Sequence, residues 1–329
     1  MATYKEIFGK SVKYLAADLP AAAGEGQIWY NSTSGTLKGS VLTSAWASGG
    51  NMNTGRSTAG DCGTQTAGLV FGGNDGNAPY AMDNTEEYNG TSWAESGTVP
   101  HDTSDCSGAG TQTAGLAFGF SSSPTEITAT YDGSTWSTVP ATIASVGQGR
   151  GIGTQAAALM VGFAAPGTTS LEYDGSSWTS GGTLNNKRSG QKPGGWGTQT
   201  AALIASGRQS PPATFISNTE TYDGSTWTET GANVITPVKR TSVSTASPSS
   251  LGIMAGGGDV IDTNDTTTGT QGWDGTAWFS QPSLATARIN AMGFGTASAG
   301  VVCGGDPGGL SGATEEFTSA AAVKTVTTS

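Results

Sequence analysis

Short runs of alternating apolar and polar residues recur along the chain, and five of them meet at a nearly identical aromatic turn. The clearest copy is Tyr131-Asp132-Gly133-Ser134-Thr135-Trp136. Asp-Gly or Asn-Gly between two short runs indicates a β-hairpin, because a type I′ turn needs positive φ at both central residues. In each copy one aromatic closes the strand that enters the turn, and the other begins the strand that leaves it. The five copies start at Tyr88, Tyr131, Tyr173, Tyr222 and Trp273.

A second phrase precedes the hairpins and ends in an apolar run. Its fullest copy is Gly63-Thr64-Gln65-Thr66-Ala67-Gly68-Leu69-Val70-Phe71-Gly72-Gly73. Self-similarity at a period of about 40–50 residues is typical of the four-stranded blades of β-propellers. The six copies, two of them diverged, start at Gly63, Gly110, Gly153, Gly197, Ser244 and Gly295. The pattern therefore predicts an all-β chain of repeated four-stranded units.

The two spacings between these phrases behave differently. From each Trp to the next Gly-Thr phrase the distance is 17 residues in five cases and 19 in the sixth. From that phrase to the next aromatic turn the distance varies more, with 20 residues from Gly153 to Tyr173 and 25 from Gly63 to Tyr88. In a four-stranded meander, the loop between strands 2 and 3 and the connection from strand 4 to the next strand 1 lie on one face. Because the 4–1 connection is nearly constant in length, the 2–3 loops account for the variation in length. The predicted strands of the first complete unit are 57–60, 69–72, 85–88 and 92–95.

The first and last units are each incomplete. Trp46 and residues 47–50 resemble a fourth strand without its first three, whereas the last unit has residues 315–317 but no fourth strand with a Trp. Pairing the two ends would remove exposed sheet edges. We therefore expect a six-bladed propeller with four antiparallel strands per blade, closed by the N- and C-terminal segments.

Residues 1–40 lie outside the repeat and are predicted to form an arm with a β-hairpin. Ile28, Trp29 and Tyr30, together with Leu37, give it too few apolar residues for a core of its own. We expect this arm to anchor the chain on a partner, and residues 41–329 to form the propeller with a short Thr-rich tail.

Composition narrows the classes of function. The 329 residues carry a net charge of −11 with only 14 Lys and Arg, so a basic surface for nucleic acid is not expected. No apolar run reaches the roughly 18 residues of a membrane span, and no signal peptide is visible. The three cysteines lack metal-type spacing and are predicted to be buried free thiols.

Several motifs resemble the kelch repeat over about residues 41–317. They are Arg56, the strand ending Phe71-Gly72-Gly73, the run Glu86-Glu87-Tyr88, and Trp93. The double glycine is missing after Phe118.

More narrowly, the Gly-Thr-Gln-Thr-Ala-Gly-Leu repeats resemble propeller proteins encoded by tailed bacteriophages of aquatic bacteria. Residues 26–31 (GQIWYN) and the tail at 324–329 (KTVTTS) add to this likeness. The resemblance implies a virion structural or tail-associated protein, present in many copies beside other virion proteins.

Candidate catalytic groups are sparse. His101 is the only histidine, and a triad around it would need a positioned nucleophile and an orienting carboxylate, so a solvent-exposed loop residue is expected. Arg56, Arg188 and Arg288 each follow a Trp by ten residues. They could hold a carboxylate as in a sialidase, but we expect a structural role.

Metal binding is not expected either. The group Asp259, Asp262, Asn264 and Asp265 matches no standard calcium loop, and we expect a solvated loop there. Thr64, Gln65 and their copies are expected to make hydrogen bonds between blades. We predict no cofactor and no metal.

The expected function is therefore structural and non-enzymatic, with the propeller presented for contact with a host-surface glycan, a receptor or another protein. Loops on a rigid scaffold carry recognition, and the longer 2–3 loops carry Tyr80, Arg208 and Phe215 as candidate binding residues. Two alternatives remain: a glycan-cleaving, sialidase-like enzyme, and a purely architectural capsid or tail decoration protein.

Overall fold

The structure is a computed structural model of the 329-residue chain. It describes residues 12–19, 26–77, 80–120, 127–141, 143, 147–163, 167–188, 192–209, 213–259, 265–306 and 308–326. This part of the chain contains β-strands and no helix, which confirms the predicted all-β class and leaves no helix that could span a membrane. Two compact units divide the chain: unit 1 comprises Met1–Ala45 and Thr318–Ser329, and unit 2 comprises Trp46–Phe317.

Unit 2 repeats one four-stranded antiparallel sheet, as the sequence predicts. Sheet 1 is β4 (Gly60–Thr64), β5 (Ala67–Phe71), β6 (Thr85–Tyr88) and β7 (Trp93–Ser96); sheet 2 is β8 (Ser107–Thr111), β9 (Ala114–Phe118), β10 (Thr128–Tyr131) and β11 (Trp136–Val139). Sheet 3 is β12 (Arg150–Gly153), β13 (Ala158–Val161), β14 (Ser170–Tyr173) and β15 (Trp178–Ser180). Sheet 4 is β16 (Gly194–Thr198), β17 (Ala201–Ala205), β20 (Asn218–Tyr222) and β21 (Trp227–Asn233); sheet 5 is β22 (Ser242–Val243), β23 (Gly252–Ala255), β24 (Thr270–Trp273) and β25 (Trp278–Gln281). A two-stranded ribbon, β18 (Arg208–Gln209) and β19 (Thr214–Phe215), lies in the loop between β17 and β20.

The sixth sheet combines strands from both ends of the chain. Its order in unit 2 is β26 (Met292–Thr296), β27 (Ala299–Cys303), β28 (Thr314–Thr325) and β3 (Thr36–Ser48). The Gly49 N–H donates to the Thr314 carbonyl at 2.9 Å, and the Trp46 and Phe317 ring centroids are 5.1 Å apart. The strand that contains Trp46 therefore pairs with the strand that contains Glu315–Phe317, as expected from the incomplete end units.

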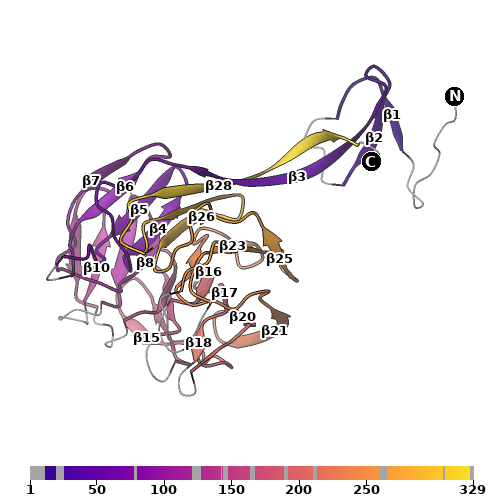
Figure 1. Ribbon diagram of the computed structural model, residues 1–329. Coiled ribbons are helices and arrows are strands. Elements are labelled where there is room, and N and C mark those ends of the chain that lie inside the picture. The colour runs from indigo at the N-terminus through magenta and orange to yellow at the C-terminus, as the bar shows by residue number, and fades with distance from the viewer. Residues whose placement is uncertain are drawn as a thin grey trace. The chain divides into compact units, whose positions relative to one another are not determined.

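The first strands of the sheets lie next to one another. β4 contacts β8 and β26, β12 contacts β8 and β16, and β22 contacts β16 and β26. In Figure 1, β4, β8, β16 and β26 lie towards the middle of unit 2, and β7, β15, β21 and β25 towards its outside. A Cβ on Gly151 would lie 2.3 Å from the Gly108 carbonyl oxygen, so the first strands approach too closely for a side chain there. This arrangement is compatible with a propeller.

Apolar side chains of neighbouring sheets form the core between them. One cluster joins Leu116 and Phe118 of sheet 2 with Met160 and Tyr173 of sheet 3. Trp178 extends it, with its ring centroid 4.9 Å from that of Phe118. Each buried side chain of this size contributes roughly 1.5–3 kcal/mol relative to exposure, so the packing holds adjacent sheets together.

Two local predictions need correction. The first strand of sheet 1 is Gly60–Thr64, not 57–60, because the Gly-Thr phrase itself ends the strand and only Gln65 and Thr66 form the hairpin loop. The aromatic turns are not type I′, since Tyr131 pairs with Trp136 across four residues of which only Gly133 has positive φ (97°). The hairpins themselves are where the sequence places them.

The strands of unit 1 also pair with one another. β1 (Lys13–Leu15) runs parallel to β2 (Ile28–Asn31), and β2 forms the predicted hairpin with β3, where Tyr30 pairs with Leu37. Trp29 is fully buried, and its indole N–H donates to Asp18 at 3.3 Å. The unit also exposes several apolar side chains: Tyr14, Ile28, Val41, Leu42 and Val326.

Candidate functional site

Six polar residues occupy the same position in the six sheets of unit 2, two residues before the first strand. We call them the pre-strand set: Thr58, Asp105, Gln148, Lys192, Arg240 and Asn290. Their φ angles lie between 42° and 67°, a left-handed conformation that costs a residue other than glycine roughly 1 kcal/mol or more. Glycine would avoid this cost, yet all six positions carry a polar side chain. Only Tyr80 and Ser206 share this conformation among the other described non-glycine residues.

Backbone hydrogen bonds join successive members of the set. The Gln148 N–H donates to the Asp105 carbonyl at 3.3 Å, and the Lys192 N–H donates to the Gln148 carbonyl at 2.8 Å. The Thr58 N–H likewise donates to Asn290 at 3.0 Å, and the Asn290 N–H to Arg240 at 3.2 Å. The pre-strand set therefore forms two hydrogen-bonded runs at one end of the first strands, Asp105–Gln148–Lys192 and Arg240–Asn290–Thr58.

Three buried charged residues tie the sheets together near this set. The Lys192 ammonium donates to the Ala59 carbonyl at 2.6 Å, which links sheet 4 to sheet 1. The Arg150 guanidinium on β12 donates to the carbonyls of Pro193 (3.0 Å) and Thr241 (2.6 Å). Burial raises the pKa of the third group, the Asp61 carboxyl on β4, while nearby Arg150 and Lys192 oppose that rise.

Basic residues outnumber acidic ones around the set. Burial lowers the pKa of the Arg240 guanidinium; Asp105 offsets this effect, and Arg208 lowers that pKa further. The Gly207 N–H, next to Arg208 in the chain, donates to the Val238 carbonyl at 3.0 Å, in the segment that leads to Arg240. Within a chain of net charge −11, this is a locally cationic site. Such a site attracts anions.

The structure brings two of the three predicted binding residues together. Arg208 and Phe215 are cross-strand partners on β18 and β19, and both are half-buried. Tyr80 lies in another loop, between β5 and β6, and is 56% exposed.

Sequence reasoning missed the pre-strand set. A signal was present, because Thr58, Asp105, Gln148 and Lys192 each lie five residues before the glycine of a Gly-Thr phrase. A polar residue repeated at this spacing, without any glycine, would have identified it.

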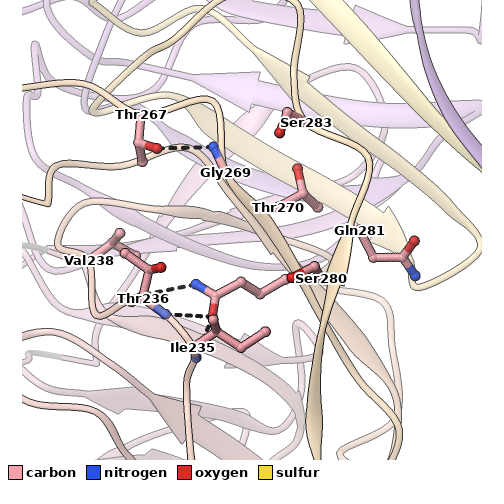
Figure 2. A pocket seen from close by; sticks show the side chains of 10 residues that line it. Ile235, Thr236, Val238, Thr267, Gly269, Thr270, Ser280, Gln281 and Ser283 are labelled. Atoms are coloured by element: carbon pink, nitrogen blue, oxygen red, sulfur yellow. Dashed lines mark hydrogen bonds between the residues drawn. The ribbon is translucent and has the colours of Figure 1, made fainter.

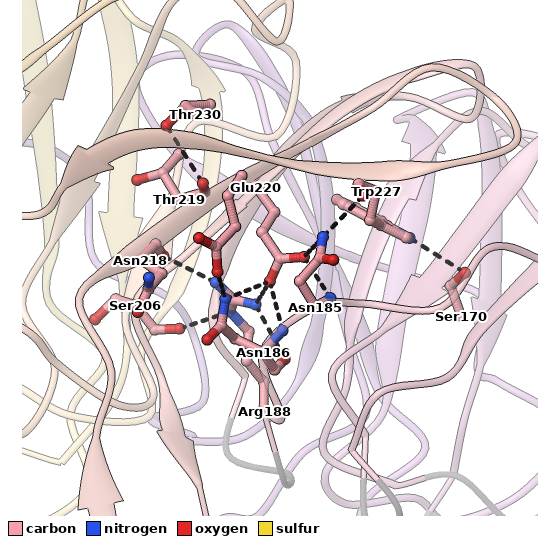
Figure 3. A network of polar contacts seen from close by, with 11 residues as sticks. Ser170, Asn185, Asn186, Arg188, Ser206, Asn218, Thr219, Glu220, Trp227 and Thr230 are labelled. Carbon is pink, nitrogen blue, oxygen red and sulfur yellow. Dashed lines mark hydrogen bonds and ion pairs between the residues drawn. The ribbon is translucent and has the colours of Figure 1, made fainter.

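The three arginines predicted to be structural are structural. The Arg56 guanidinium pairs with Glu86 at 2.7 Å and also donates to the carbonyls of Gly72 (3.0 Å) and Asn84 (2.9 Å). Arg188 pairs with Glu220 in the same way (Figure 3), and Arg288 pairs with Glu315 at 2.8 Å. Each guanidinium is buried against the carboxylate of a third strand, so these arginines do not form a binding site for a substrate carboxylate.

Sheet 5 has a cleft of about 150 Å³ at the position where sheets 1, 4 and 6 have a buried arginine. Val238 lies four residues before β22, as Arg56 lies four residues before β4, and Gln271 takes the place of the glutamate. The Gln271 side-chain oxygen accepts the N–H groups of Ile235 (2.7 Å) and Thr236 (3.1 Å). Figure 2 shows the cleft with Thr236 and Val238 on one side and Thr267 and Gly269 on the other.

Other predicted features have simple outcomes. Cys62, Cys106 and Cys303 are buried and free, as expected, and burial raises the pKa of the Cys106 thiol to about 11. His101 is exposed, also as expected. Asp259 and Asp265 are exposed, whereas Asp262 and Asn264 lie outside the described residues. Within the described ranges no group of three His, Cys, Asp or Glu side chains is placed to hold a metal ion.

Comparison of the sequence with models of known protein families and with curated proteins gave no match.

Proposed function

We propose that residues Trp46–Phe317 close into a six-bladed, kelch-like β-propeller. The supporting observation is a hydrogen bond repeated in every sheet, from the fourth-strand Trp indole to the first or second residue of the third strand of the preceding sheet. The bond from Trp93 to Thr314 is 3.1 Å, and the bond from Trp136 to Thr85 is 2.9 Å. The other four run from Trp46 to Thr270, Trp178 to Thr128, Trp227 to Ser170 and Trp278 to Thr219.

The glutamines of the Gly-Thr-Gln phrase support the same closure. The Gln112 side-chain amide donates to the carbonyls of Gly68 and Tyr88 in sheet 1, both at 3.0 Å. The Gln65 amide does the same to Gly300 and Phe317 of sheet 6. These are the hydrogen bonds between blades that the sequence predicts, and they include the step from sheet 6 to sheet 1.

We further propose that the protein is a non-enzymatic structural component of a phage particle, associated with the tail or a fibre, whose propeller contacts the host surface. The observation that carries the recognition role is the pre-strand set, since six polar side chains are kept at positions where glycine would relieve strain. Strained backbone of this kind clusters at binding sites. The phage origin is supported by the sequence resemblance.

Unit 1 is proposed to attach the chain to other virion proteins. Trp29 is buried and holds the unit together, so the surface is provided by Ile28, the half-buried Tyr30 and Leu42, which is exposed on β3. Replacing Ile28 and Leu42 with Ser should reduce incorporation into the particle, measured by quantitative mass spectrometry of purified virions, and an unchanged copy number would contradict this role.

Glycine substitution tests the recognition role without disturbing the fold. The triple variant Gln148→Gly, Arg240→Gly and Asn290→Gly removes three side chains from positions with positive φ, where glycine is unstrained. We expect the labelled variant to bind host cells about tenfold more weakly, with its melting temperature unchanged or higher. Equal binding by the variant and the parent protein would refute the role. The matched control is Lys38→Gln on unit 1.

A further inference from the structure

We propose that Asn89, in the aromatic turn of sheet 1, is a site of spontaneous deamidation, at which the folded chain converts its own asparagine to aspartate and isoaspartate. This modification does not depend on the recognition role proposed above, and its failure would leave that role unchanged.

The aromatic turn fixes the glycine and leaves the residue before it variable. Asn89-Gly90 is the only Asn-Gly pair in the sequence, whereas the other four aromatic turns have Asp-Gly. Gly90 has a φ of 88°, and a Cβ there would lie 3.1 Å from the Thr66 methyl carbon, so another residue would be strained. The turn in sheet 1 therefore keeps an unhindered backbone nitrogen next to a side-chain amide.

The Gly90 nitrogen is the nucleophile of this reaction. In the part of the chain that the structure describes, no group accepts its N–H, whereas the N–H groups of Asn89, Thr91 and Ser92 on either side are all hydrogen-bonded. Asn89 is exposed, so hydroxide from the solvent can reach the turn and remove the Gly90 proton. The attacking and attacked groups belong to adjacent residues, which holds them close together.

The same turn activates the amide that is attacked. The Asn89 side-chain oxygen accepts the N–H groups of Thr91 and Ser92, both at 2.9 Å. Two backbone donors on one carbonyl oxygen form an oxyanion hole, which stabilises the negative charge that develops as a nucleophile adds to the carbon. The Asn89 amide nitrogen donates to the Ser92 hydroxyl at 3.3 Å, so a proton source lies beside the leaving group.

The reaction needs no reagent other than water. The Gly90 nitrogen forms a bond to the Asn89 side-chain carbonyl carbon, the bond from that carbon to the amide nitrogen breaks, and ammonia leaves with a proton from the solvent or from Ser92. A cyclic imide remains. Water then adds to either of its carbonyls: opening on one side gives aspartate, and opening on the other sends the main chain through the side chain as isoaspartate.

The aspartate turns are protected from the corresponding reaction at neutral pH. Hydrogen bonds from Thr135 and Ser134 lower the pKa of Asp132 to about 2, so its carboxyl is ionised at neutral pH. An ionised carboxylate resists attack by a nucleophile, whereas the Asn89 amide is uncharged at every pH at which the protein is folded. The same donor geometry therefore stabilises Asp132 and activates Asn89.

The two products differ in their effect on the fold. Aspartate at position 89 reproduces the other four turns. Isoaspartate adds an atom to the backbone between Tyr88 and Trp93, which pair across the hairpin. The Trp93 indole donates to Thr314 of sheet 6 at 3.1 Å, so isoaspartate should weaken the contact between sheets 1 and 6.

Incubation of the whole folded protein at pH 8 in heavy-oxygen water, followed by peptide mapping with mass spectrometry, tests the proposal. We expect labelled oxygen to enter at Asn89 at least about tenfold faster than at any other asparagine. Asp132→Asn moves the reactive pair to sheet 2, where Ser134 and Thr135 supply the same donors, and should react at a similar rate. Ser92→Ala should slow the reaction, and Asn89→Asp should abolish it with the melting temperature unchanged.

A synthetic peptide of residues 87–95 gives the rate without the turn. Faster labelling of this peptide than of the folded protein would overturn the proposal, because the hydrogen bonds would then protect Asn89 instead of activating it. Earlier labelling at another asparagine, or none at position 132 of the folded Asp132→Asn variant, would also overturn it. Melting temperatures establish that each variant is folded.

Discussion

In four of the five aromatic turns an aspartate accepts hydrogen bonds from the residues that follow it. One Asp132 carboxylate oxygen accepts the N–H groups of Ser134 (2.9 Å) and Thr135 (2.8 Å), and the carboxylate also accepts both hydroxyls. These bonds lower the pKa of Asp132 to about 2. Asn89 accepts the same pair of backbone N–H groups in sheet 1, so the geometry of the turn needs the oxygen but not its charge.

This comparison predicts how acid acts on the turns. The folded-state pKa of Asp132 is depressed from 3.8, so its contribution to stability is present above about pH 4 and is lost as the pH falls through about 2. In Asp132→Asn this part of the pH dependence should disappear. Urea unfolding of both proteins at pH 5, 4, 3 and 2 measures it, and Asn89→Asp should increase the dependence. Parallel stability curves for all three proteins would contradict the explanation.

At the scale of the sheet, a buried ion pair is present or absent as a unit. Sheet 1 has Arg56 with Glu86, whereas sheet 2 has Thr103 and Ala129 at the corresponding positions and sheet 5 has Val238 and Gln271. Glu86 also accepts the backbone N–H groups of Asn53 and Thr54, as Gln271 does from its own loop. The glutamate therefore has two partners, a loop and a cation, and only the loop is present in sheet 5.

Removing the cation alone should be costly. Arg56→Val leaves the carboxylate of Glu86 fully buried without its counter-charge, and we expect a loss of about 3–5 kcal/mol in the free energy of unfolding. Arg56→Val with Glu86→Gln copies sheet 5, keeps the bonds to the loop, and should lose markedly less. Equilibrium denaturation of the three proteins measures the difference, and a double variant as unstable as the single one would show that the charge is not the cause.

The converse change fills the cleft in sheet 5. Val238→Arg alone places a guanidinium beside a neutral Gln271, whereas Val238→Arg with Gln271→Glu rebuilds the pair found in sheets 1, 4 and 6. We expect the two substitutions to couple favourably by about 0.5–3 kcal/mol in a double-mutant cycle. Additive effects would mean that the cleft cannot accommodate the side chain.

How far the sequence predicts these elements depends on the residue type. Trp136 and its equivalents mark strand ends because large aromatics are unambiguous, and the pairing of β3 with β28 followed from the two incomplete units. The first strands were misplaced because Gly60, Asp61 and Gly63 carry no apolar signal; their burial comes from neighbouring sheets. The site was only partly foreseen. Arg208 and Phe215 were chosen from loop length, but the positive φ of Asn290 was not foreseen, because a repeated polar residue outside any strand gives no local sign of a left-handed conformation.

At the scale of the whole molecule, stability should depend on the one strand that comes from the opposite end of the chain. Deleting residues 1–50 removes β3, exposes the edge of β28 and leaves Thr270 without the indole of Trp46. We expect aggregation or unfolding, detected by light scattering and near-ultraviolet circular dichroism. Deleting residues 1–35 is the matched control, because it spares β3. A soluble product of the longer deletion with a normal melting temperature would count against closure by this strand.

The pairing of β3 with β28 also imposes a delay during synthesis of the chain, because the two strands are made far apart in time. Residues 36–48 leave the ribosome before any other strand of sheet 6, and residues 314–325 leave it after all the others. At about 5–20 residues per second, β3 waits roughly 13–50 s for its partner. Throughout that interval Val41 and Leu42 lie on an unpaired strand, which is a template for a neighbouring nascent chain. Misassembly between nascent chains is therefore most favoured on crowded polysomes. Faster translation would shorten the interval in which β3 is unpaired without changing any contact of the folded state.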